Sequence, residues 1–180
     1  MSLTLSEIGA GPVPDLVEPV EAWRVWRVGM REGGVVLKSL FAGTVWEPAV
    51  PLAASCAVGH RPRWRPWRVE VNRHAVPDLD CSCGIYGVRS AAAARWYLDS
   101  RTFLYRSERV IGRVALWGEV VESQLGWRAA RAYPIELFVP APAAVQSGLR
   151  RRAYVDEIVV ALEAYRVPVD VVAPNALAVD

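Results

Sequence analysis

The amino-acid sequence predicts an α+β fold: a small twisted antiparallel sheet or partly closed β-barrel, with an irregular insert and a C-terminal helix. Between residues 21 and 140, segments rich in β-branched and aromatic residues alternate with turns that contain Gly or Pro, a pattern typical of short strands. After a Pro/Ala-rich link at 140–148, apolar residues recur at helical spacing. A long irregular segment, 51–88, contains all three cysteines and both histidines.

These patterns divide the chain of 180 residues into an arm, a domain and a C-terminal extension. Residues 1–20 form an N-terminal arm, because their prolines and glycines follow no period. Residues 21–140 form the β-rich domain, and 141–180 supply a helix and a strand that pack on it. A hydrophobic content of 53% and a charged content of 22% are typical of a folded globule.

The composition also bears on the compartment and on the partners. No apolar run approaches the ~18–20 residues of a membrane span, and the N-terminus lacks the basic start and apolar core of a signal peptide. We therefore expect a cytoplasmic protein, in which cysteines serve as metal ligands or buried thiols rather than disulfides. A net charge of +2 and a pI near 8.6 are too mild to indicate nucleic-acid binding by themselves.

The first elements predicted in the domain are strands. Residues 22–29 and 35–41 read as a hairpin around the turn at 31–34, with Gly33 or Gly34 at the positive-φ position. Residues 43–50 then give a third short strand, which ends at its prolines.

A helix and a long hairpin follow the irregular segment. Residues 90–100 predict a short helix, with Ser90 as its N-cap and four alanines behind it. Residues 109–123 give the strongest strand pattern, in which Gly112 and Gly118 indicate bends or bulges. Residues 127–139 return as one or two strands broken by Pro134.

The C-terminal part predicts a helix over 149–167 and an edge strand over 167–172. The helix is predicted because apolar residues with spacings of four, four and three fall on one face: Tyr154, Ile158, Leu162 and Tyr165.

The irregular segment predicts a structural zinc site. Zinc prefers thiolate and imidazole ligands, and a structural site is tetrahedral and filled by four protein groups. One set of residues supplies such a Cys3His shell: Cys56, His74, Cys81 and Cys83. His60 is the alternative to His74, which we favour because Pro77 can turn the chain between it and Cys81. Gly84 would let the backbone fold closely around the sulfurs.

Other chemistries compete for the same residues. A 2Fe–2S cluster with mixed ligation is one, a catalytic thiol activated by His74 or His60 is another, and buried cysteines without a function are a third. The proximity of two cysteines and a third nearby favours coordination. A closed shell leaves no position for substrate, so the metal is expected to stabilise an insert rather than to catalyse a reaction.

A second motif interleaves arginine with tryptophan at 60–68. Its prolines favour an extended backbone. Guanidinium and indole groups along such a ribbon suit phosphates and splayed bases, whereas solvated arginines with tryptophans packed on the domain are the alternative. The expected ligand contacts are Arg61, Arg63, Trp64, Arg65, Trp67 and Arg68.

Two resemblances rest on these motifs. The run HAVPDLDCSCGIY, followed by VIGRVALWGEVVE and GWRAARAYP, resembles a group of uncharacterised actinobacterial proteins with a cysteine, His-x-x-Pro and Cys-x-Cys-Gly-Ile-Tyr. This resemblance covers residues 21–140 and implies no particular activity. The curled sheet with its VIGRVALWGEVVE strand is similar to PUA-like barrels, a likeness that implies binding of RNA or a modified base.

The sequence thus leads to three hypotheses on function. The first is a zinc-stabilised, non-enzymatic binding module for nucleic acid or a modified base. The second is a protein–protein interaction adaptor that uses exposed tryptophans and the C-terminal helix, and the third is a metal- or thiol-dependent enzyme. The oligomeric state is left open by the sequence.

Overall fold

The computed structural model describes most of the domain and the C-terminal extension. The described residues are 18–32, 34–56, 59–60, 70–71, 74–99, 109–141, 149–173 and 176. Most of the predicted N-terminal arm and the Arg/Trp residues of 61–68 lie outside these ranges, so their predicted roles stay predictions.

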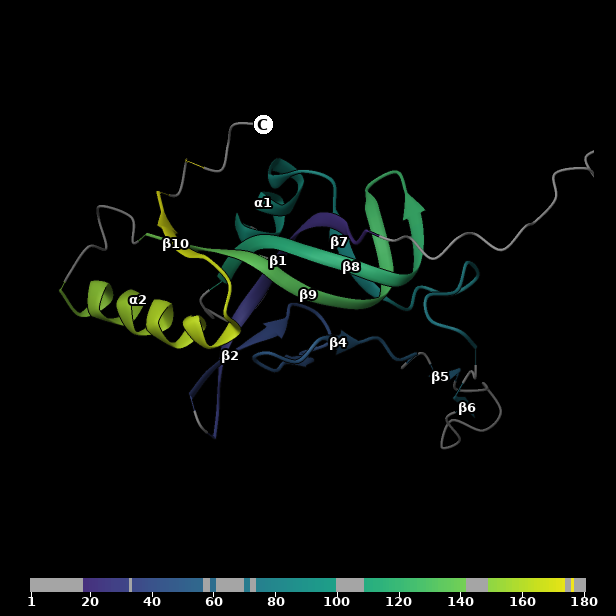
Figure 1. Cartoon of the computed structure of the whole chain (residues 1–180), viewed down its shortest axis with the longest axis horizontal. Helices are drawn as coiled ribbons and strands as arrows, with labels where there is room; N and C mark the ends of the chain where they lie inside the picture. The colour runs from purple at the N-terminus through teal and green to yellow at the C-terminus, as the bar shows by residue number, and fades with distance from the viewer. Residues whose placement is uncertain are drawn as a thin grey trace, which may run out of the picture.

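Figure 1 shows the elements in space. Eight strands form one sheet, and β5 and β6 form a separate pair. In chain order the elements are β1 (Val20–Arg31), β2 (Gly34–Ser39), β3 (Val45–Trp46), β4 (Leu52–Ala53), β5 (Gly59–His60), β6 (Glu70–Val71), β7 (Ile85–Val88), α1 (Ala91–Asp99), β8 (Arg109–Ser123), β9 (Gly126–Pro140), α2 (Leu149–Leu162), η3 (Glu163–Tyr165) and β10 (Val169–Val172).

The predicted first hairpin is confirmed. β1 pairs antiparallel with β2 from Trp26↔Ser39 to Arg31↔Gly34. Gly34 has φ +128°, which a side chain would strain. β3 then pairs with β2 through Leu37↔Trp46, as expected for a third short strand.

The long second hairpin is confirmed, with one correction. β8 carries register shifts at Arg113/Val114 and Trp117/Val120, and Gly118 within the second shift has φ +77°. Pro134 does not break β9, which runs as one strand of 15 residues. Pro134 pairs with Val114 at the first shift. Proline has no backbone N–H to donate to the ladder, and the β-bulge at this position accommodates it.

The segment predicted to be irregular contains a strand that closes a ring. β7 pairs with β1 at Trp23↔Val88 and with β9 from Ile85↔Ala129 to Val88↔Gly126. Since β1 also pairs with β8, and β8 with β9, the order β1–β8–β9–β7 returns to β1. This ring of strands anchors the end of the insert that carries two of the cysteines.

Both helices lie where they were predicted, but the buried face of α2 differs from the predicted one. Ala93 N donates to Ser90 Oγ at 3.2 Å, so Ser90 caps α1 as expected. On α2 the buried residues are Val155, Ile158 and Leu162, whereas Tyr154 is 39% exposed. The predicted stripe was therefore wrong at its first member, because Val155 lies closer to the axis of the buried face than Tyr154 does.

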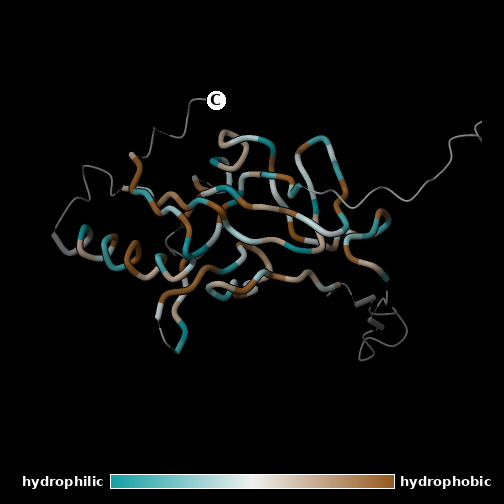
Figure 2. Tube along the Cα trace, in the orientation of Figure 1, coloured by the Kyte–Doolittle hydropathy of each residue, from teal (hydrophilic) through white to brown (hydrophobic). Residues whose placement is uncertain are grey.

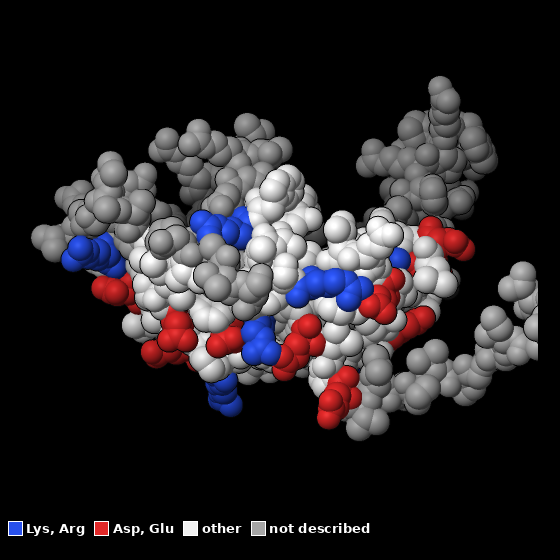
Figure 3. Space-filling model, turned by 90° about the horizontal axis from the view of Figure 1, so that it is seen from above, with Lys and Arg blue, Asp and Glu red and all other residues white. Residues whose placement is uncertain are grey.

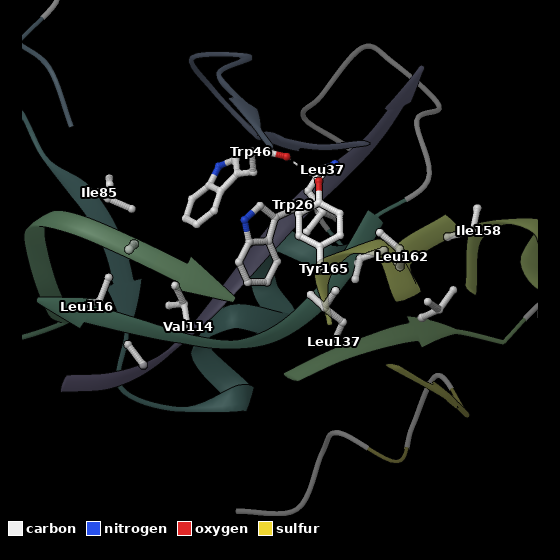
Figure 4. Packing of buried hydrophobic residues seen from close by; sticks show 14 of the residues in the cluster. Trp26, Leu37, Trp46, Ile85, Val114, Leu116, Leu137, Ile158, Leu162 and Tyr165 are labelled. Carbon is white, nitrogen blue, oxygen red and sulfur yellow. Dashed lines mark hydrogen bonds between the residues drawn. The ribbon is translucent and has the colours of Figure 1, made fainter. Parts of the chain in front are cut away.

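The core lies between the ring and α2 (Figure 4). Trp26 and Trp46 pack edge to face with ring centroids 5.5 Å apart, an arrangement that aromatic pairs favour. The buried Tyr165 hydroxyl donates to the Trp46 carbonyl and accepts from Leu37 N–H at 2.8 Å. These bonds join the C-terminal extension to β2 and β3.

A second apolar cluster lies under α1. Val110 belongs to the core and the adjacent Ile111 to this second cluster, because successive side chains of a strand point to opposite faces. Figure 2 shows stretches of hydrophobic residues along the strands, with hydrophilic residues between them. The sheet thus carries apolar side chains on both faces, where the two helices cover it.

The C-terminal strand differs from the expected antiparallel pattern. β10 is the predicted edge strand, but it pairs parallel with β9, from Val169↔Leu137 to Val172↔Pro140. The intervening α2 and η3 carry the chain back from Pro140 to the level of Leu137, so that β10 can run in the same direction as β9. Among the described elements, no helix combines the length and the apolarity needed to cross a bilayer.

Candidate metal centre

The structure brings the four predicted ligands together. The ligand atoms of Cys56, His74, Cys81 and Cys83 all lie within 4.8 Å of one another. Cys56 follows β4, His74 follows β6, and the two other cysteines lie just before β7. Four groups separated in the sequence therefore converge close enough to hold a metal ion.

The separation of two sulfurs fits a tetrahedral ion. Cys56 Sγ lies 3.7 Å from Cys81 Sγ, and the three cysteines are free thiols. At a Zn–S distance of about 2.3 Å, two thiolates of a tetrahedral site are about 3.8 Å apart, whereas a disulfide would need about 2.05 Å. The observed spacing therefore matches shared coordination.

His74 has one ring nitrogen engaged and one without a partner. Its Nδ1 lies 2.6 Å from the carbonyl oxygen of Ala75, whereas its Nε2 is buried and has no hydrogen-bond partner among the described residues. A ligating histidine commonly donates its second N–H to a carbonyl, which fixes the tautomer. This arrangement leaves Nε2 to bind a metal. The rival ligand, His60, lies in β5, and its side chain is outside the described part.

The surroundings shift the pKa values of the cluster in different directions. The hydrogen bond to the Ala75 carbonyl raises the pKa of His74, and the nearby Cys81 and Asp78 raise it further. A hydrogen bond with the backbone of Cys83 lowers the pKa of Cys81, whereas burial raises the pKa of Cys83. Cys81 therefore loses its proton more readily than Cys83, and metal binding must displace the proton of Cys83.

The turn before β7 places the two cysteines. Cys81 N–H donates to the Asp78 carbonyl at 3.3 Å, and Asp80 N–H donates to Asp78 Oδ1 at 2.9 Å, which is an Asx turn. Gly84 has φ +117°, and a Cβ there would lie 3.1 Å from Pro77 Cβ. Gly84 therefore permits a close approach to Pro77 and Arg128, while the predicted folding of its backbone around the sulfurs stays a prediction.

Arg128 is a component of this centre that the sequence did not reveal. Its guanidinium donates to the carbonyl of Cys81 and, at 3.0 Å, to the carbonyl of Cys83. The pairing Tyr86↔Arg128 of β7 and β9 places it there. These two bonds tie the backbone of the ligand turn to β9. Arg128 follows Cys83 by 45 positions, so no local motif could have indicated it.

The cluster also lies at the base of an arm, which we define as residues 57–73. β5 and β6 pair at Gly59↔Val71 and His60↔Glu70, and Figure 1 shows them apart from the main sheet. In the sequence, Cys56 precedes this strand pair and His74 follows it. A metal bound by both residues would therefore close the base of the arm.

No protein-family model, curated protein or solved structure matches this chain.

Proposed function

We propose that this protein is a non-enzymatic nucleic-acid-binding module in which a structural zinc ion fixes the base of the Arg/Trp arm. The observation that carries the proposal is the position of Cys56 and His74. They flank the arm on its two sides, and they converge with Cys81 and Cys83 from the ring of strands. The zinc would join the arm to the domain.

Zinc is the ion that this donor set suits best. Three sulfurs and one imidazole favour zinc over magnesium or calcium, which prefer oxygen ligands. Three thiolates around Zn²⁺ leave a net charge of −1. The guanidinium of Arg128, bonded to the carbonyls of Cys81 and Cys83, lies where it would balance that charge.

The role of the ion follows from its complete shell. Four protein ligands fill a tetrahedral site, whereas catalytic zinc keeps a position for water or substrate. We therefore assign the metal to stability and not to chemistry. A structural zinc ion couples metal binding to folding, and in this chain the coupled part is the arm.

The arm carries the chemistry that would contact nucleic acid. Its guanidinium and indole groups can pair with phosphates and stack on bases: Arg61, Arg63, Trp64, Arg65, Trp67 and Arg68. Figure 3 shows acidic and basic side chains interspersed over the described surface on the face seen there. The arm instead holds four arginines within the eight residues 61–68, and a single-stranded ligand suits it because unstacked bases are available.

Titration of labelled nucleic acids at several salt concentrations tests this proposal. Arg63→Gln/Arg65→Gln should weaken binding of single-stranded RNA or DNA at least about tenfold and reduce the salt slope by about 1–2. The matched control is Arg131→Gln/Arg152→Gln, which removes the same charge from exposed positions of β9 and α2. A Kd above ~10⁻⁴ M at low salt for every RNA and DNA form would contradict the proposal.

A further inference from the structure

A cavity of about 630 Å³ lies beside the metal centre. It opens between β1, the β2–β3 turn, β7 and the β8–β9 hairpin, and Tyr97 of α1 contributes to its wall. Ser82, Cys83 and Gly84 also line it, so the metal-bearing turn forms part of the wall. This volume lies within the ~300–1,000 Å³ typical of small-molecule sites.

The lining of the cavity is mainly apolar and aromatic. Leu40 and Ile85 are buried in its wall. Aromatic side chains contribute from the sheet, from the β8–β9 hairpin and from the helix: Trp23, Trp127 and Tyr97. Flat rings of this kind favour a planar apolar body by stacking and edge contacts.

Arg24 is the charged residue in this lining. Its guanidinium donates to the Tyr86 carbonyl and, at 3.1 Å, to Ser39 Oγ. Its Cζ also lies 5.0 Å from the centroid of the Trp46 ring. Its Nε is buried without a hydrogen-bond partner in the described structure. Three of the five N–H donors of a guanidinium therefore lack a partner within the described ranges.

The charge of Arg24 has no acidic partner among the described residues, whose ion pairs involve other arginines and His74. Burial lowers the pKa of Arg24 to about 10, which reflects the loss of water around the cation. Arg24 is only partly exposed to solvent, and a charge withdrawn from water is costly unless an opposite charge and hydrogen bonds compensate it. An anion in the cavity would supply both.

We propose that this cavity binds a small planar organic acid, whose carboxylate pairs with Arg24 and whose apolar body lies among Leu52, Ile85 and Trp127, on the side of β1 that Arg24 faces. The guanidinium presents donors in a planar fork that matches a carboxylate. The site is separate from the arm, and it does not depend on nucleic-acid binding.

A purely structural role for Arg24 is the competing explanation. β1 pairs with β7 at Trp23↔Val88 and with β2 from Trp26↔Ser39 onward. Arg24 lies between these two pairings, and its side chain bonds to one residue of β7 and one of β2. A bridge of this kind would stabilise the sheet without conferring any preference for charged ligands. The two explanations differ in whether the cavity discriminates an acid from its neutral isostere.

Calorimetric titration of the zinc-loaded full chain with 2-naphthoate and 2-naphthamide makes this distinction. The two probes share one shape and differ in charge. We expect the acid to bind at least about tenfold more tightly, the ratio typical of a charge-assisted pair. Equal affinities, or no binding of naphthoate below about 1 mM, would overturn the proposal with the wild-type chain alone.

Variants then assign the preference to Arg24. Arg24→Gln should remove the preference for naphthoate and change the affinity for naphthamide by less than about twofold. Arg27→Gln is the matched control, because Arg27 also lies on β1 and donates to the Ser39 carbonyl but is not part of the lining, and it should keep the preference. If Arg24→Gln does not fold, Arg24→Lys keeps the charge without the fork and should retain only part of the preference. A full preference in either Arg24 variant would overturn the proposal.

Discussion

Cys56 Sγ lies 3.7 Å from Cys81 Sγ across a sequence separation of 25 residues. The two thiols meet because Cys56 leaves the sheet at β4 and Cys81 enters the turn that leads to β7. Both ends of the intervening segment are thus anchored to the main sheet, through β4 on β9 and through β7 on β1 and β9. The contact therefore places one candidate thiol ligand on each side of the arm.

This relationship predicts the metal content of the purified protein. We expect one zinc ion per chain by native mass spectrometry, and three thiols that become reactive only after chelation. Cys83→Ser should abolish zinc binding and lower the free energy of unfolding by at least about 2 kcal/mol, because a ligand that binds only the folded state stabilises it.

Ser82→Ala is the matched control for Cys83→Ser. It lies in the same turn between the two cysteines, and it should keep the zinc ion and the wild-type stability. If the wild-type chain is purified without metal, and its cooperative unfolding temperature is unchanged when zinc is added, no structural zinc is present.

Arg128 provides a second prediction. Its bonds to the carbonyls of Cys81 and Cys83 hold the turn that carries these two ligands. Arg128→Gln should weaken zinc affinity by about 10–100-fold, as is typical of groups that orient metal ligands. Competition with a chromophoric chelator measures this change. Arg131→Gln, at an exposed position of the same strand, should leave the zinc affinity unaltered.

Gly84 gives a third prediction, in which crowding is separated from backbone strain. Gly84→Ala places a Cβ 3.1 Å from Pro77 Cβ at φ +117°. Gly34→Ala meets nothing within 4 Å at a similar φ of +128°. Both should lose about 1–3 kcal/mol in denaturant unfolding through strain, but only Gly84→Ala should also weaken zinc binding. Equal zinc affinities in the two variants would contradict this role of Gly84.

The sequence predicted those features that depend on neighbouring residues. The β1–β2 hairpin and the N-cap of α1 were predictable because turn glycines and a capping serine act within a few positions. The convergence of Cys56, His74, Cys81 and Cys83 was predictable because few residue types bind zinc and they gather in one segment.

Features that depend on distant pairing were not predictable. Arg128 reaches the metal centre through the register of β7 with β9, and Arg24 reaches the cavity through the pairing of β1 with β7. A single sequence does not contain these registers. The helical face was misassigned at Tyr154 because apolar residues occur at both 154 and 155, and only packing against the core distinguishes them.

Tyr165 gives the last prediction, which concerns pH. Its buried hydroxyl bonds Leu37 N–H and the Trp46 carbonyl. Tyr165→Phe should destabilise the fold by about 1–3 kcal/mol near neutral pH, because it leaves a buried N–H without its acceptor. Tyr86→Phe is the control: its hydroxyl donates to the Ser82 carbonyl at an exposed position, where water can replace it, so the effect should be smaller.

Burial raises the pKa of Tyr165 to about 12, above the value near 10 expected in the unfolded chain. Below pH 10 both states are neutral and the stabilisation is complete. Between pH 10 and 12 the unfolded chain ionises first, so unfolding releases a proton and stability falls by about 1.4 kcal/mol per pH unit. Urea unfolding from pH 9 to 11 should therefore show the advantage of wild type over Tyr165→Phe shrinking above pH 10. A constant difference across this range would mean that Tyr165 is hydrated enough to ionise without unfolding.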